Sequence, residues 1–411
     1  MNLLIIGLIT VMYGIDLAVT LLNDRHSRRP LPPHAQGIYH AEQYARWLNY
    51  SLATLRHEII TKSVITALML ALLVFGAFGA LERWTSAWFD QPLLQTLAFL
   101  GMFAFLNLLV GLPSSYYKTF VIEEKFGFNK TTHKTFILDV LKSLGLGIAL
   151  GGGVVSLLHA LYIAFAQQLW LFIFSAWALL SVLLVILFIL NTKVFVRLFN
   201  KLTPLPQGEL RDAIERLASQ VGFNVRAISI MDASKRSTKL NAFFSGLGKT
   251  REVVLFDTLL EKLKTEEILS VLAHELGHAI HKDAVRFLAV QIAILGLYAG
   301  LIGAILQSPQ LAQAFGLSGV HFGFGLVLFS ILIEPIDLLL SLPVNAISRK
   351  AEFAADAFAA HATSAQPTMN VLRILAQENL ANLNPHPLYV LLHYTHPPIP
   401  ERLRAISGQG G

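Results

Sequence analysis

The 411-residue sequence contains no cysteine, which excludes disulfide bonds, cysteine nucleophiles and thiolate metal ligands. Any zinc site in this chain must therefore be built from histidine, aspartate or glutamate. Charged residues are also scarce, at 14% of the chain, whereas soluble domains usually carry about 25%. No DNA- or RNA-binding motif accompanies the formal net charge of +6, so no nucleic-acid partner is expected.

Long apolar stretches are frequent, and apolar residues make up 54% of the sequence. The first stretch is not a signal peptide, because its basic residues follow it and no small-residue cleavage site is present. The pattern predicts a multi-pass protein embedded in a lipid bilayer. Seven windows are long enough, or nearly so, to cross a hydrocarbon core of about 30 Å, near residues 3–22, 64–81, 93–112, 143–166, 169–192, 287–306 and 322–342.

Basic residues alternate between the segments that join these windows. Segments 23–63 and 113–142 are rich in Lys and Arg, whereas 82–92 contains only Arg83 and 307–321 contains none. Because cytoplasmic loops carry the excess of positive charge, the N-terminus is expected outside and the C-terminus in the cytoplasm.

Residues 193–286 have the pattern of a small folded unit that contains both helix and strand. Thr265 is expected to be the N-cap of the helix that contains residues 271–280. Periodicity and turn residues predict helices at Glu209–Val221 and Leu259–Lys264, and strands at Val225–Met231, Asn241–Ser245 and Glu252–Phe256.

The stretch VLAHELGHAI, residues 271–280, carries the strongest chemical signal in the sequence. On a helix, His274 and His278 project from one face, where two imidazoles can ligate a single zinc ion. Glu275 lies beside them, where it can accept a proton from the attacking water. The alternative is an apolar helix that carries two packed histidines by chance.

A catalytic zinc ion needs a third protein ligand and an open position. Glu352, in SRKAEFAADAF, is the best candidate, and Asp356 lies one turn further on, where it can hydrogen-bond a ligating histidine. If the HELGH helix continues into the sixth span, the short loop between spans six and seven brings His278 and Glu352 together at one membrane face. The alternative is that both carboxylates lie on an ordinary solvated helix end.

The sequence resembles the type I CAAX prenyl endopeptidases, which are integral-membrane gluzincin zinc metalloproteases. The resemblance covers most of the chain. It rests on the long stretch Tyr116–Lys142 and on four shorter motifs that follow in the family's order: LNAFFSG, HELGH, SRKAEFAADAF and HPPIPERL.

The resemblance implies a fold and a set of residue roles. The fold would be seven transmembrane helices forming a hollow chamber, with a small α+β zincin-type metalloprotease domain on the cytoplasmic side. One zinc ion per chain would be bound by His274, His278 and Glu352, with Glu275 as general base. Asn241 and Ala242 would bind the substrate backbone, and His396 would stabilise the oxyanion. Arg349 would lie near the site and pair with a carboxylate.

These expectations divide the chain into four parts and suggest where it acts. Residues 1–192 would hold five spans, 193–286 the domain with HELGH, 287–342 two more spans, and 343–411 the rest of the zinc site. The length, with no evident endoplasmic-reticulum retrieval signal, suggests a bacterial inner-membrane protein. Bacteria do not generally prenylate their proteins, so the expected partner is a peptide or protein substrate with or without a prenyl group.

Two rival functions remain open at this stage. The first is a broad quality-control protease of membrane proteins, and the second is a non-proteolytic chamber protein that binds lipid. Polar residues within the predicted spans either line a hydrated chamber wall or hydrogen-bond between helices; they are Asp16, Asn107, His159, Glu334 and Asp337.

Overall fold

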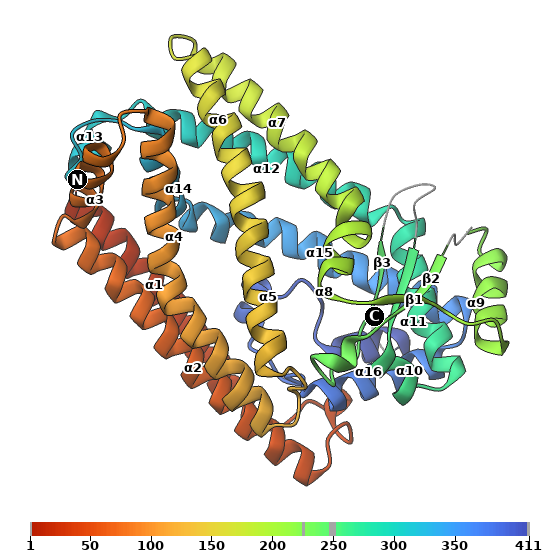
Figure 1. The fold of residues 1–411 in the computed structure, drawn as a ribbon. Coiled ribbons are helices and arrows are strands. Elements are labelled where there is room, and N and C mark those ends of the chain that lie inside the picture. Colours follow the sequence, from red (N-terminus) through yellow and green to blue (C-terminus); the bar gives the residue numbers. More distant parts are fainter. Residues whose placement is uncertain (1, 224–226, 246–251, 409–411) are drawn as a thin grey trace.

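The computed structural model describes residues 2–223, 227–245 and 252–408, and most of them are helical (Figure 1). Six helical stretches are long and apolar enough to cross a membrane. Three of them contain π-helical turns (η2 to η4) within one continuous rod. The six are α1 (Asn2–Ser27), α2 (Ala41–Val74), α4 with η2 (Pro92–Tyr117, Lys118–Glu123), α5 with η3 and α6 (His133–Leu146, Gly147–Gly151, Gly152–Ala164), α7 with η4 and α8 (Leu169–Leu190, Asn191–Val196, Arg197–Phe199), and α12 (Asp283–Leu306).

The seventh span is broken. Helices α14 (Phe322–Leu332) and α15 (Glu334–Ala362) meet at an angle of 56° and pass the membrane test only as a pair. Pro335 occupies the first turn of α15, where it cannot donate a backbone hydrogen bond to the preceding turn. The bent pair completes the seven crossings expected from the sequence, and α15 then continues well beyond the predicted window.

The predicted boundaries of the second span are wrong. The window 64–81 extends across the end of α2 at Val74, and Gly76 adopts a left-handed conformation (φ 63°) before α3 (Ala77–Trp88) begins. The apolar composition continues across this break, so hydropathy alone does not reveal it. The helix instead begins far earlier than predicted, at Ala41.

The spans follow one another around a ring, as Figure 1 shows from one side. Contacts run from α1 to α2, α4, α6, α7, α12 and α14 in turn, and Ile5 and Ile9 of α1 share an apolar cluster with Leu328 of α14. Only 6% to 28% of each apolar window is buried inside the protein. Such low burial is expected when one helix face meets lipid and the other faces a chamber.

The polar residues of the spans divide between the two roles expected of them. Asp16, Asn107 and Glu334 line a cavity of about 390 Å³ together with Lys62, whose Nζ lies 2.8 Å from Asp16 Oδ2. Asp337 instead accepts a short hydrogen bond from Tyr298 on the neighbouring α12.

The segment between the fifth and sixth spans contains, among its described residues, a four-stranded sheet in the order β1-β2-β4-β3. β1 (Leu202–Pro204) was not predicted; β2 (Ala227–Met231), β3 (Ala242–Ser245) and β4 (Glu252–Phe256) were, although Val225 and Arg226 lie outside the described residues and Asn241 precedes β3. β2 and β4 are parallel, and β3 is antiparallel to β4 at the edge of the described sheet.

The HELGH helix α11 (Thr265–Ile280) packs on this sheet. Leu272 and Leu276 share a buried core with Val253 and Leu255 of β4. Lys264, and not Thr265 as predicted, is the N-cap, and its backbone N–H donates to Glu267 Oε2 (2.9 Å). The remaining elements are η1 (Pro33–Ala35), α9 (Glu209–Gln220), η5 (Ala233–Lys235), α10 (Asp257–Lys262), α13 (Pro309–Ala314), α16 (Ala365–Asn379), α17 (Pro387–His393) and α18 (Ile399–Ile406).

Candidate metal centre

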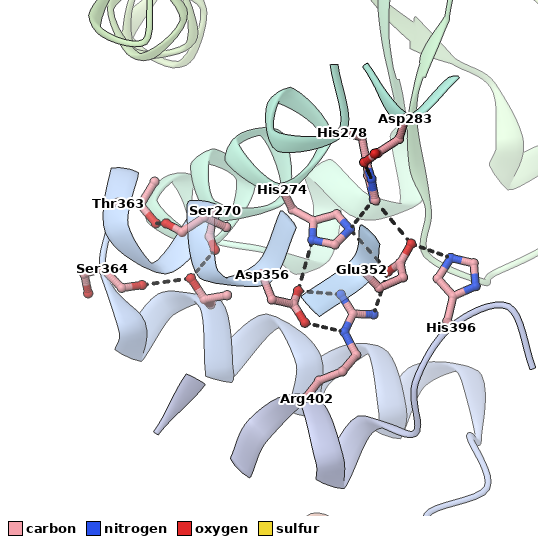
Figure 2. A network of polar contacts seen from close by, with 12 residues as sticks. Ser270, His274, His278, Asp283, Glu352, Asp356, Thr363, Ser364, His396 and Arg402 are labelled. Carbon is pink, nitrogen blue, oxygen red and sulfur yellow. Dashed lines mark hydrogen bonds and ion pairs between the residues drawn. The ribbon is translucent and has the colours of Figure 1, made fainter. Parts of the chain in front are cut away.

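Three predicted ligands from two helices converge where α11 packs against α15 (Figure 2). His274 Nε2 and His278 Nε2 lie 3.2 Å apart. Glu352 Oε1 lies 3.3 Å from His278 Nε2, and Glu352 Oε2 lies 3.5 Å from His274 Nε2. Gly277 allows this close approach, because a Cβ there would come within 3.1 Å of the α15 backbone at Ala355. These distances support the hypothesis that Glu352 is the third metal ligand, which the sequence alone could only suggest.

The spacing of these donor atoms fits a tetrahedral zinc ion. Zinc–nitrogen and zinc–oxygen bonds of about 2.0–2.1 Å would place adjacent ligand atoms about 3.3–3.4 Å apart. Among the described residues, no other group of three His, Asp or Glu side chains brings its ligand atoms within 4.8 Å of one another. Glu352 Oε2 is buried without a hydrogen-bond partner in the described part of the chain, so a cation would satisfy it.

Asp356 and Arg402 support the two ligand-bearing helices from behind. Asp356 Oδ1 lies 3.0 Å from His274 Nδ1, the ring nitrogen opposite the metal-facing one, as predicted. Arg402 of α18 donates to both oxygens of Asp356 (2.7 and 2.6 Å), and its Nη1 lies 3.5 Å from Glu352 Oε2. Sequence analysis did not select Arg402. The sequence did offer one signal: Glu352 and Asp356 lie one turn apart, and two buried carboxylates need a cationic partner.

Asp283 orients the second histidine and was also missed. The sequence-based expectation of one helix from HELGH into the sixth span is wrong, because α11 ends at Ile280 and α12 begins at Asp283. Lys282, between them, adopts a left-handed conformation (φ 58°). This turn brings Asp283 Oδ2 to 2.9 Å from His278 Nδ1. On a continuous helix, a residue five positions on would face away from His278.

We expect Asp283→Asn to lower metal affinity by about ten- to a hundredfold, because an aspartate that accepts from a ligand histidine fixes its ring and raises its basicity. Competition with a chelator on the purified full-length chain measures the change. Arg286→Gln is the matched control, since this largely exposed side chain touches only the other oxygen of Asp283 (3.4 Å). Equal metal retention in the two variants would contradict the orienting role of Asp283.

The prediction that Arg349 pairs with a carboxylate is wrong within the described residues. Its Nη1 donates to the backbone carbonyls of Val390 (3.0 Å) and Tyr394 (2.7 Å). One turn earlier on α15, buried Asn345 donates to the carbonyl of Leu392 (2.7 Å). Arg349 therefore ties the helix that carries Glu352 to the segment that leads to His396.

His396 projects from this segment toward the metal ligands. Its Nε2 lies 3.2 Å from Glu352 Oε1, and its Nδ1 lies 2.9 Å from Thr395 Oγ1. The imidazole is 63% exposed to solvent in the absence of substrate. Glu275, His396, Asn241 and Ala242 all line one pocket of about 210 Å³ with His274 and Glu352. The structure thus brings every predicted site residue except Arg349 to this pocket or directly behind it.

Contacts with two carboxylates favour the protonated form of His274. Burial by itself lowers the pKa of His274, but contacts with Asp356 and Glu352 outweigh this effect and raise the pKa to about 9. Below pH 9 the metal-free pocket is therefore protonated at His274, and metal binding must displace that proton.

Each zinc ion that binds is expected to release about one proton or more at neutral pH. The affinity for zinc should fall about tenfold for each pH unit of acidification below 9. Calorimetric titration of zinc into the metal-free protein, in buffers of different ionisation enthalpy, counts the protons. Binding without proton release at pH 7 would contradict the raised pKa of His274.

Comparison with known proteins agrees with this geometry. Residues 21–201 match the family model described as CAAX prenyl protease N-terminal, five membrane helices. Residues 204–409 match the model of peptidase family M48. The boundary between the two matches falls at β1, where the sheet of the metalloprotease domain begins.

The similarity to individual proteins extends over nearly the whole chain. The chain is 34% identical to a CAAX prenyl protease 1 homolog of Arabidopsis thaliana, with 98% of this chain and 97% of the relative covered. Identity to CAAX prenyl protease 1 of Saccharomyces cerevisiae is 33%, over 93% of this chain and 89% of the relative. The crystal structure of S. mikatae Ste24p superposes with a TM-score of 0.93 at 31% identity and covers 98% of both chains. The chain therefore belongs to peptidase family M48 and is an integral-membrane metalloendopeptidase of the CAAX prenyl protease type.

Proposed function

We propose that the chain binds one zinc ion through His274, His278 and Glu352 and hydrolyses peptide bonds near the C-terminus of prenylated substrates. The observation that carries this proposal is the convergence of two helices on a set of donor atoms within 4.8 Å of one another, in the pocket that also contains Glu275. When bound, zinc supplies a Lewis acid for the scissile carbonyl and for the attacking water.

The side chains of the pocket have separate tasks in this proposal. Glu275 accepts a proton from the attacking water and returns it to the leaving amine. His396, whose Nδ1 faces Thr395, donates from Nε2 to the developing oxyanion. Ala242 begins the strand at the sheet edge beside the pocket, and an extended substrate would add there as a further strand. Asn241 Oδ1 accepts from the Ala242 N–H (2.9 Å) and so shapes that edge.

Two peptides that differ only by a prenyl group on one cysteine test the substrate class. The proposal expects a higher kcat/KM for the prenylated peptide, because the tail adds apolar contacts inside the membrane chamber. Equal values would favour the rival hypothesis of a broad membrane-protein protease. No cleavage of either peptide by the zinc-loaded protein would contradict the proposed substrate class, with Glu275→Gln as the inactive reference.

The orientation we propose places the N-terminus outside and the metalloprotease domain in the cytoplasm. Because the native chain has no cysteine, single substitutions report accessibility cleanly. Ser308→Cys and Gln168→Cys, in turns between spans, should label from outside, and Ser407→Cys, after α18, should label only after the membrane is permeabilised. Labelling of all three from the same side would contradict the topology.

The bacterial inner membrane is the location we propose, from the length of the chain; the relatives compared above are eukaryotic. The division into residues 1–192, 193–286, 287–342 and 343–411 likewise stays a prediction. It is supported by the sheet and α11 lying between the fifth and sixth spans.

A further inference from the structure

A second pocket lies at the end of the membrane ring away from the metal ligands. We call it the distal pocket; it has a volume of about 170 Å³ and is lined by residues of α3, α4, α6 and α14. Leu306, at the end of α12, and Phe322, at the start of α14, share one apolar cluster there. His278 lies near the opposite end of α12, and 24 helical residues span about 36 Å. The distal pocket is therefore separate from the hydrolytic site.

One buried side chain in the distal pocket has an unused polar atom. His159 on α6 is 5% exposed, its Nδ1 lies 3.4 Å from Thr96 Oγ1, and its Nε2 has no partner in the described part of the chain. The other walls are mostly apolar and include Phe99, Tyr162 and Phe322. An unpaired buried nitrogen is costly, so this pocket favours a ligand that supplies one polar atom.

The N-terminus of α14 lies in the wall of the same pocket. Phe322, Gly323 and Phe324 line it, and the first intrahelical bond of α14 is donated by Gly325 N to His321 O (2.9 Å). The backbone N–H groups of the three preceding residues therefore have no acceptor within the helix. Together with the positive end of the helix dipole, they favour an oxygen acceptor.

The carboxylate in the wall does not compete for these donors. Glu82 accepts from Ser318 N (2.9 Å) and Ser318 Oγ (2.7 Å), and His321 Nε2 contacts its Oε1. Glu82 is thereby occupied in holding the turn between α13 and α14. In the tautomer of His159 that carries its proton on Nε2, Thr96 Oγ1 donates to Nδ1 and Nε2 is left as a buried donor.

We propose that the distal pocket binds the head of an acyl lipid, with a carboxylate or ester oxygen accepting from His159 Nε2 and from the N-terminus of α14. The apolar walls would contact the first methylenes. The rest of the tail would leave past Ile163, a pocket-lining residue of α6 that is 57% exposed. A free fatty acid and an esterified lipid share this chemistry.

Cysteine protection in nanodiscs tests the proposal on the full-length chain. Ser86, an exposed residue at the mouth of the pocket, is replaced by cysteine, and its maleimide reaction rate is measured with and without decanoate, 1-decanoylglycerol or decane. The proposal expects severalfold slower reaction with decanoate or the ester and no change with decane. Protection by decanoate alone identifies a free fatty acid, whereas protection by the ester identifies an esterified lipid. Gln168→Cys, outside the pocket, is the matched control and should react at one rate throughout.

His159→Leu in the Ser86→Cys background removes the donor at similar side-chain size and should abolish the protection. Thr96→Val provides a milder second variant, because it removes only the hydroxyl that orients His159, and should weaken the protection. Peptidase activity and melting temperature verify that both variants fold. No protection by either oxygen-bearing probe, equal protection by decane, or protection that survives both substitutions would overturn the proposal.

Discussion

Replacement of Glu275 by glutamine is expected to lower peptide turnover by about a hundredfold or more, which is the usual contribution of general acid–base help. Glutamine keeps the size and helix propensity of the side chain but cannot accept the proton of the attacking water. Metal content and melting temperature should stay close to those of the unmodified chain, because Glu275 is none of the three converging donors. All three quantities are measured on one preparation.

The matched control for this variant is Glu266→Gln, an exposed glutamate in the first turn of the same helix. It makes the same chemical change on α11 away from the pocket, and its turnover should be unaffected. Near-normal turnover of Glu275→Gln with a full metal complement would remove Glu275 as the base. A large fall in melting temperature would instead point to a structural role.

Replacement of Glu352 by alanine should remove the metal and with it essentially all activity. A catalytic zinc site has three protein ligands, and two imidazoles alone bind far more weakly. The substitution would also remove one of the carboxylates that face Arg402, because Arg402 Nη1 lies 3.5 Å from Glu352 Oε2. Elemental analysis after purification gives the metal-to-protein ratio, which should fall from about one to near zero. His274→Ala and His278→Ala should behave in the same way.

Glu378→Gln on α16 is the control for loss of a carboxylate, because Glu378 pairs with Lys262 (3.2 Å) away from the ligands. Full metal and full turnover in Glu352→Ala would refute the third-ligand assignment. Asp356 would then be the next candidate, although its oxygens are now held by Arg402 and by Nδ1 of His274, on the far side of that ring.

The sequence allowed the cluster of His274, His278 and Glu352 to be predicted because its geometry is local or follows from topology. His274 and His278 share a helix face through a four-residue spacing, and Glu352 joins them through two adjacent spans. Strand β4 was predicted to the residue because four consecutive apolar residues, Val253–Phe256, stand between Glu252 and Asp257.

The supporting residues could not be predicted in this way, because their positions depend on backbone turns and tertiary packing. Asp283 reaches His278 only through the left-handed turn at Lys282. Lysine rarely adopts this conformation, so the sequence did not indicate the turn. Arg402 is far from Asp356 in the sequence, and no periodicity links them. For Arg349, the expectation of a carboxylate partner failed because backbone carbonyls, which sequence patterns do not display, accept its hydrogen bonds.

The position of Arg402 along the chain has a consequence for biosynthesis. The two histidines are translated before the sixth span, whereas Glu352 and Arg402 follow only after the chain has crossed the membrane twice more. A nascent chain that has reached the end of α12 therefore holds half of a hydrolytic centre, beside a translocation machinery made of membrane proteins. Glu352 and the Arg402 that contacts it are added last, so the hydrolytic centre stays incomplete until the residues beyond the seventh span have been made.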